Sequence, residues 1–189
     1  NWNESRKARD QEILILQNLR AELEGNFSQW DFIFERQKVR HAATQHLLSN
    51  DLHVLTTERL DLLMDSVLYN WTFNPSRGVY QSIINSGKLD LISNRELRTQ
   101  IAGLGDKVDD YIEDEASAWS FSRTYLQPLS AKSYPLLLGA PRTSSEMKEL
   151  KNQLLKTALS QEYRNNIKLM AAYLESVVLD EGPLLEQEF

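Results

Sequence analysis

The sequence contains no cysteine among its 189 residues. Disulfide frameworks, zinc thiolate sites and cysteine nucleophiles are therefore excluded. Glycine and proline are also scarce, with seven and five residues, and so few breakers favour long helices over a turn-rich β fold. No apolar run approaches the roughly 20 residues that span a bilayer, so no membrane-spanning segment is expected inside this chain.

The charge balance argues against a nucleic-acid partner. The net charge is −6, and no Lys/Arg cluster is dense enough to displace counterions from a phosphate backbone. The last fifteen residues carry no basic residue, only the acidic residues Glu175, Asp180, Glu181, Glu186 and Glu188. Anionic lipid or DNA would repel this end of the chain.

One very long first helix is predicted over residues 4–49, because no proline interrupts them and only Gly25 weakens them. Apolar residues recur there at spacings of three or four and form a continuous stripe: Ile13, Leu16, Leu19, Leu23, Phe27, Trp30 and Phe34. Such a helix is about 70 Å long. A domain of this size cannot cover it all, so we expect part of it to project.

Start and stop signals predict the remaining elements. A second helix is predicted from Thr56 or Thr57 to Asn70, and a third from Asn74-Pro75 to a left-handed cap at Gly87, followed by an extended stretch 88–92. A long helix then runs from a Ser93–Glu96 capping box to Pro128, and an irregular stretch 129–142 follows it. The last helices begin at a Thr143–Glu146 capping box and at Ser160, and they end at Gly182-Pro183. The prediction is an all-α, up-and-down helical bundle with a very long first helix, forming a single domain over residues 1–189.

The residues typical of metal sites are present but poorly spaced. His41, His46 and His53 are five and seven residues apart, whereas a helical metal pair needs a spacing of three or four. An acidic run spans residues 106–115, in which Asp106, Asp110 and Glu113 share a helix face. Paired carboxylates can bind a cation or perform acid–base chemistry, but a solvated helix face is the favoured interpretation.

No complete motif set of a nucleophilic or phosphate-binding enzyme occurs. The sequence has no GxSxG, and its glycines are too scattered to cradle a phosphate. We therefore expect no enzymatic activity and no cofactor. The alternative is an enzyme or metal-binding bundle that uses the acidic run.

Aromatic residues offer the weak candidates for a binding site. Trp71 and Phe73 fall in a predicted loop beside Arg77, with Tyr80 following. Exposed loop aromatics can anchor a partner or line a ligand pocket. Packing of the loop onto the bundle is the competing interpretation. Trp30 and Trp119 lie on apolar stripes and are expected in the core.

Three stretches resemble a family of uncharacterised bacterial single-pass membrane proteins. The first is the opening motif of Asn1, Trp2, Asn3 and Glu4, followed by Arg6 and Lys7. The second covers residues 80–92, with Gly87 and Leu89, and the third covers residues 161–165. The role of these signature residues is unknown. The resemblance implies an apolar helix ahead of Asn1 that anchors the protein in the inner membrane, with residues 1–12 close to the bilayer.

The resemblance also implies a side of the membrane. The basic segment that leads the family's apolar helix stays in the cytoplasm by the positive-inside rule, which places this domain in the periplasm. The function is unknown, and the leading hypothesis is a membrane-anchored helical interaction or sensing domain that acts through protein contacts or a small ligand. It would pair with itself or with a protein partner. A structural spacer is a further alternative.

Overall fold

The computed structural model describes residues 2–49, 51–134 and 143–188, and within these ranges the chain forms helices and no strand. The elements in chain order are α1 (Trp2–Ser49), η1 (Leu52–Val54), α2 (Thr57–Leu68), α3 (Gly78–Asn85), η2 (Lys88–Leu91), α4 (Arg95–Phe121), η3 (Ser122–Leu126), α5 (Gln127–Ser133), α6 (Ser144–Ala158), α7 (Gln161–Glu175), η4 (Ser176–Glu181) and α8 (Gly182–Glu186). The predicted all-α fold with a very long first helix is confirmed.

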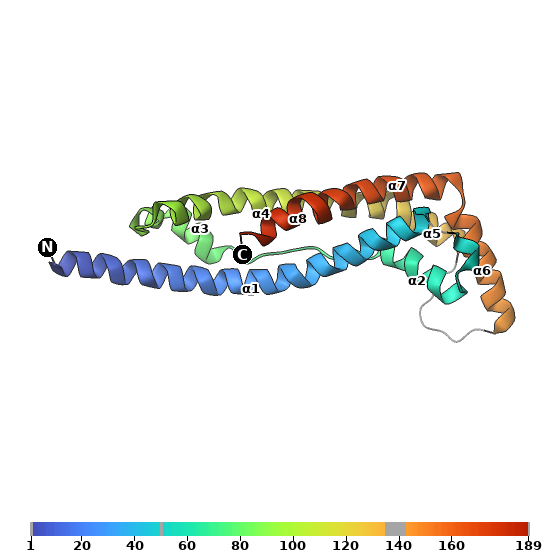
Figure 1. The fold of residues 1–189 in the computed structure, drawn as a ribbon, viewed down its shortest axis with the longest axis horizontal. Coiled ribbons are helices and arrows are strands. Elements are labelled where there is room, and N and C mark those ends of the chain that lie inside the picture. Colours follow the sequence, from blue (N-terminus) through green and yellow to red (C-terminus); the bar gives the residue numbers. More distant parts are fainter. Residues whose placement is uncertain (1, 50, 135–142, 189) are drawn as a thin grey trace.

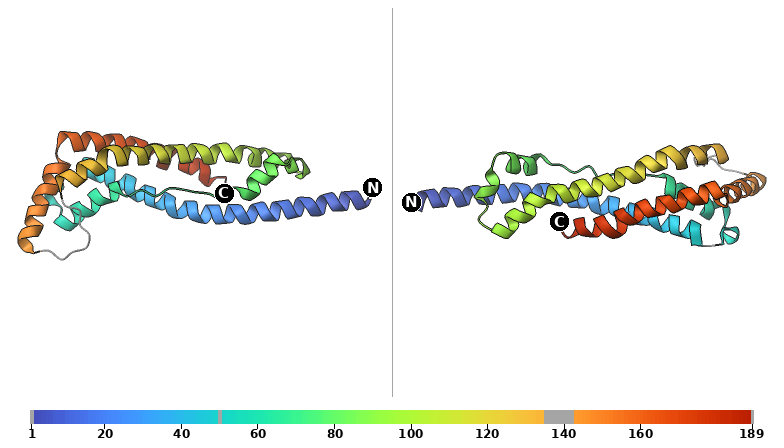
Figure 2. Two further views of the ribbon diagram at one scale, coloured as in Figure 1. Left: turned by 180° about the vertical axis from the view of Figure 1, so that it is seen from behind. Right: turned by 90° about the horizontal axis from the view of Figure 1, so that it is seen from above.

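The molecule is an elongated up-and-down bundle (Figure 1). The helices α1 and α4 run in the same direction, and α7 returns between the far end and the middle of the molecule. The other return is only half helical: α2 covers the far end, and residues 69–77 then continue as an extended segment along α1 toward α3 (Figures 1 and 2). The helix α6 stands crosswise at the far end.

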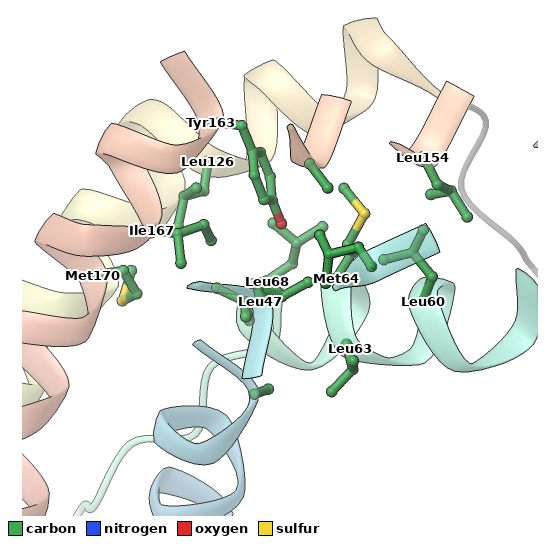
Figure 3. Packing of buried hydrophobic residues seen from close by; sticks show 14 of the residues in the cluster. Leu47, Leu60, Leu63, Met64, Leu68, Leu126, Leu154, Tyr163, Ile167 and Met170 are labelled. Carbon is green, nitrogen blue, oxygen red and sulfur yellow. The ribbon is translucent and has the colours of Figure 1, made fainter. Parts of the chain in front are cut away.

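The apolar core is divided into three clusters along α1. A far cluster joins the end of α1 to α2, α6, α7 and the end of α4, with Met64, Leu154 and Tyr163 almost completely buried (Figure 3). A middle cluster surrounds Trp30 and Phe73. An N-terminal cluster packs Ile15 and Leu19 of α1 against α3 and α4. The long helix therefore connects all three parts of the core.

Local capping signals set several helix boundaries as predicted. The Thr143–Glu146 capping box opens α6, and the Ser160 side chain accepts a hydrogen bond from Tyr163 N at the start of α7. Gly87 has φ +70° after the end of α3, the left-handed conformation expected of a glycine cap. These positions depend on contacts within one turn, which a sequence shows directly.

Other predicted helix starts are wrong because α1 engages the residues concerned. The Ser93 amide and hydroxyl both donate to the Glu12 carboxylate, at 2.6 and 2.7 Å, so Asn94 caps α4 instead. The third helix begins at Gly78 and not at Asn74-Pro75. The stretch 88–92, predicted as extended, contains a 3₁₀ turn that follows the left-handed Gly87.

Both predicted proline stops are also wrong. The chain stays helical through Pro128 in α5 and through Pro183 in α8. Helix α5 therefore occupies the first residues of the stretch 129–142, which was expected to be irregular. Residues 135–142 lie outside the described ranges. A proline in a helix clashes with the carbonyl four residues earlier. Here a π-helical turn precedes each proline, η3 and η4 respectively, and its wider hydrogen-bonding pattern moves that carbonyl aside.

The close approach of α8 to α1 yields a first prediction. A Cβ on Gly182 would lie 2.2 Å from the buried Phe34 ring and 2.7 Å from the Val177 carbonyl oxygen. We expect Gly182→Ala to lower the free energy of unfolding by about 1–3 kcal/mol, as overpacking does, in urea unfolding followed by circular dichroism.

Gly103→Ala is the matched control. Gly103 lies inside α4, and a Cβ there would meet no atom within 4 Å. Alanine should stabilise the helix by about 0.5–1 kcal/mol, because glycine has the lower helix propensity. Equal effects of the two substitutions would contradict the proposed contact between Gly182 and Phe34.

Candidate functional site

The extended segment of residues 69–77 is bound to α1 through its backbone. The Asn26 side chain donates to the Ser76 carbonyl oxygen and accepts from the Ser76 amide, both at 2.8 Å. The Glu22 carboxylate accepts from the amides of Val79 and Tyr80 at the start of α3, at 2.8 and 2.9 Å. An extended segment has backbone groups that no helix satisfies, and polar side chains of α1 satisfy them here.

Two buried polar residues bind the same extended segment in the core: Gln37, farther along α1, and Glu115 of α4. Gln37 Nε2 donates to the Trp71 carbonyl oxygen at 2.7 Å and to Glu115 Oε1 at 3.2 Å. Glu115 Oε2 accepts from the Phe73 amide at 2.7 Å. Burial raises the pKa of the Glu115 carboxyl, and these two hydrogen bonds and the nearby charge of Arg40 oppose the rise.

Arg40 closes this polar cluster on the side of α2. Its side chain is only 2% exposed. Nε donates to the Val67 carbonyl oxygen at 3.0 Å, in the last turn of α2, and Nη1 donates to Asn70 Oδ1 at 2.6 Å. Burial lowers the pKa of Arg40 to about 10 and the charge of Glu115 opposes this, so the guanidinium remains positive at neutral pH. A cation at a helix C-terminus is stabilised by the free carbonyl groups there.

The outer side of this cluster forms a shallow depression of about 220 Å³. Trp71 is 42% exposed, and its ring meets the Phe32 ring edge-on with the centroids 5.6 Å apart. The Arg36 guanidinium lies 5.4 Å from the Trp71 centroid and 5.1 Å from that of Phe32. The lining residues are Arg36, Val39, Arg40, Ser66, Tyr69 and Trp71.

The four predicted binding candidates do not share one site. Trp71 lines the outer depression, whereas Phe73 is 1% exposed and belongs to the middle cluster. Arg77 forms an ion pair with Asp109 at 2.5 Å. The Tyr80 hydroxyl accepts from the Gly105 amide at 3.1 Å. Arg77 and Tyr80 border a space of only about 20 Å³, which holds little more than a water molecule.

The acidic side chains of residues 106–115 differ in exposure, because they lie on different faces of α4. Asp106, Asp110 and Glu113 lie exposed on α4, while Glu115 points into the core. Asp109 pairs with Arg77. Among the described residues no three His, Asp or Glu side chains are placed to hold a metal ion together.

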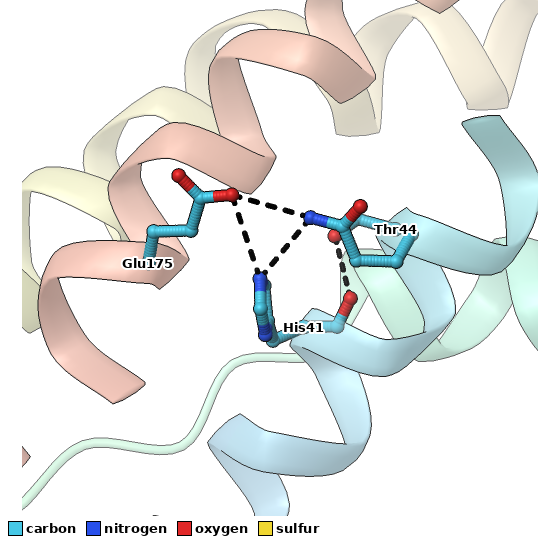
Figure 4. Close-up of polar contacts among 4 residues, drawn as sticks. His41, Thr44 and Glu175 are labelled. Atoms are coloured by element: carbon cyan, nitrogen blue, oxygen red, sulfur yellow. Dashed lines mark hydrogen bonds and ion pairs between the residues drawn. The ribbon is translucent and has the colours of Figure 1, made fainter. Parts of the chain in front are cut away.

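The histidines and the tryptophans of the bundle differ in how deeply they are buried. His41 is partly buried where α1 meets α7, with its Nε2 4.0 Å from Glu175 Oε1 and 3.2 Å from Gln45 Nε2 (Figure 4). His53 is exposed. Trp30 is completely buried, as expected, whereas Trp119 is only partly buried beneath Arg123.

Sequence reasoning missed Glu22, Asn26, Gln37 and Arg40. They lie on the face of α1 that carries Trp30 and Phe34, because steps of three or four residues connect them along the helix. Polar residues that continue an apolar stripe were the available signal. Nothing in the sequence indicated that they would bind an extended segment.

Replacing Glu115 by glutamine tests the burial of its carboxyl. Since burial raises the pKa above its ordinary 4.5, the folded chain binds this proton more tightly than the unfolded chain. The stabilisation from this group therefore falls as the pH rises from about 4.5 through the raised pKa. We expect Glu115→Gln to gain stability relative to the natural chain over that window, in urea unfolding at several pH values.

Glu113→Gln is the control, because Glu113 is exposed on the same helix. It should show no such pH-dependent gain. A stability difference for Glu115→Gln that stays constant with pH, or shrinks as the pH rises, would contradict the assigned direction of the pKa.

The helices of the described ranges include none that is both long enough and apolar enough to cross a bilayer. In the comparison with known protein families, the model of a family of unknown function (DUF6090) matches residues 1–112. This part contains α1, α2, the extended segment, α3 and most of α4. It also contains the motif from Asn1 to Glu4, of which Asn1 lies outside the described residues, and Gly87 and Leu89. No curated protein and no solved structure matches the chain. The chain belongs to the family of unknown function DUF6090.

Proposed function

We propose that this chain is the extramembrane part of a single-pass bacterial membrane protein and works as an interaction or sensing domain. The apolar anchor would precede residue 1, and the domain would lie in the periplasm, as the resemblance of the opening motif implies. Its contacts would be with a protein partner, a second copy of itself or a small ligand. This proposal assigns it no enzymatic reaction.

The observation that carries the proposal is the exposed N-terminal end of α1. Residues 2–11 are all exposed, and the first buried residue is Ile15. An unpacked helix end of this length is marginally stable in water. A membrane helix that continued directly into α1 would nucleate it and hold it straight.

The residues at this end suit a position beside a bilayer. Trp2 is 74% exposed at the tip, with the Arg6 guanidinium 5.7 Å from its ring centroid. Tryptophan is favoured at the membrane interface, where its ring meets both lipid and water. Arg6, Lys7 and Arg9 follow on the exposed helix. Basic residues beside an anchor favour the cytoplasmic side, so the protease test below decides between the two sides of the membrane.

Self-association is the partner arrangement that α1 supports best. Ile13 and Leu14 are 45% and 58% exposed on the projecting end. An apolar groove of about 530 Å³ continues from there between α1 and α4, lined by Leu16, Leu23, Phe27 and Leu97 among others. Anchored copies share one orientation, so their α1 helices would meet side by side.

The membrane anchor is tested on the natural full-length protein in its own bacterium. We expect it to remain in the membrane pellet after alkaline carbonate washing. We also expect added protease to cleave it in spheroplasts but not in intact cells. Recovery from the soluble fraction would refute the anchor, and protection in spheroplasts would place the domain in the cytoplasm.

Pairing through α1 is tested by single cysteines, since this chain has none. We expect Leu14→Cys to form a disulfide-linked dimer when native membranes are oxidised. Val54→Cys is the control, because Val54 is 77% exposed in η1, which follows the C-terminal end of α1 and so lies at the opposite end of that helix from Leu14. No dimer at position 14, or equal dimer at both positions, would exclude parallel pairing of α1. Crosslinking and mass spectrometry from the same membranes would then identify another partner.

A further inference from the structure

We propose that the depression over Arg40 binds the carboxylate or phosphate group of a small ligand, with Arg36 and Arg40 as the recognising groups. The depression lies between α1, the C-terminal end of α2 and the first residues of the extended segment. Its volume of about 220 Å³ is below the usual range of drug-sized sites. It suits one anionic group with a short apolar part.

The first argument is the unused donor of Arg40. Two of its nitrogens bind Val67 and Asn70, but Nη2 is buried and has no hydrogen-bond partner among the described residues. Leaving such a donor unsatisfied is costly, and more so on a charged group. Because Arg40 lines the depression, an anionic oxygen seated there could accept from Nη2 after a small shift of the rim.

The second argument is the position of Arg36. It lies one helical turn before Arg40, and like charges at this spacing repel each other. No carboxylate among the described residues forms an ion pair with Arg36; its neighbour Glu35 pairs with Lys38. The Phe32 and Trp71 rings hold the guanidinium over the depression. A bound oxyanion would neutralise both charges, and guanidinium groups fit carboxylate and phosphate geometry.

The acidic group that acts on the charge of Arg40 is Glu115. Glu115 faces Arg40 from α4, but its two oxygens are occupied by Gln37 and the Phe73 amide. Burial raises the pKa of Glu115, which reduces the charge it sets against an incoming anion. On the outer side Trp71 and Tyr69, both exposed, offer apolar faces to the rest of the ligand.

The alternative is that Arg40 only secures the end of α2. That role needs Nε and Nη1 alone, and it predicts no response of Arg36 or Trp71 to anions. The inference rests on that version of the proposed function in which the domain binds a small ligand. It is tested on the 189-residue chain in solution, so its failure would leave the membrane anchor and α1 pairing untouched.

The experiment is a titration of ¹⁵N-labelled chain with phenyl phosphate and with benzoate, followed by NMR. The reporter is the indole N–H signal of Trp71, assigned from its loss in Trp71→Phe. We expect a saturable shift with at least one probe, half complete at about 1 mM or below. The stronger probe identifies the group as phosphate or carboxylate. Benzyl alcohol, which keeps the ring without the charge, should give no saturable shift.

Charge variants complete the test. Arg36→Gln should weaken binding about fivefold or more, because it removes an exposed guanidinium that lines the depression. Arg20→Gln is the matched control: Arg20 is exposed on the same helix and pairs with Glu24, and its loss should leave binding unchanged. Absence of saturation with both anions, equal binding of benzyl alcohol, or equal effects of the two variants would overturn the proposal.

Discussion

The extended segment between α2 and α3 lies against the core of a helical bundle, and its backbone groups must therefore find partners on other elements. Side chains of α1 and α4 supply them: Asn26 and Gln37 from one side, and Glu115 from the other. A buried amide left without an acceptor is destabilising by about 1–3 kcal/mol. The path of this segment depends on these bonds, and through it so do the position of Phe73 in the core and that of Trp71 on the surface.

This arrangement makes α1 the reference element of the molecule. This helix of 48 residues contributes side chains to all three apolar clusters along its length. Its polar side chains hold the extended segment in place. Among the described residues the N-terminal cluster contains five buried residues, and residues 2–11 of α1 extend beyond it and are exposed. Any displacement applied at that end would reach the bundle along a continuous helix. This mechanical continuity is what the proposed role of a membrane-anchored interaction or sensing domain would require.

Arg40 and Glu115 are the two buried charged residues of the polar cluster, and burial shifts the pKa of each. Arg40 and Glu115 influence each other electrostatically without a direct ion pair among the described contacts, and each also binds backbone. Paired buried charges seldom add net stability over apolar packing, although removing one of them is costly. Their value here lies in fixing one path for the extended segment. Arg40 also lines the outer depression beside Trp71, and in this way it connects the polar cluster of the core to the surface.

The sequence by itself determined the helical class, the long first helix, its projecting end and those boundaries that depend on contacts within one turn, such as the caps at Thr143, Ser160 and Gly87. These features follow from propensity and periodicity, which are local. Tertiary structure alone decided that Ser93 would bind Glu12 instead of capping α4, that π turns would carry helices through two prolines, and that polar residues on α1 would satisfy an extended segment. Each of these depends on a partner tens of residues away or on a change of helical geometry, and neither leaves a periodic signal in the sequence.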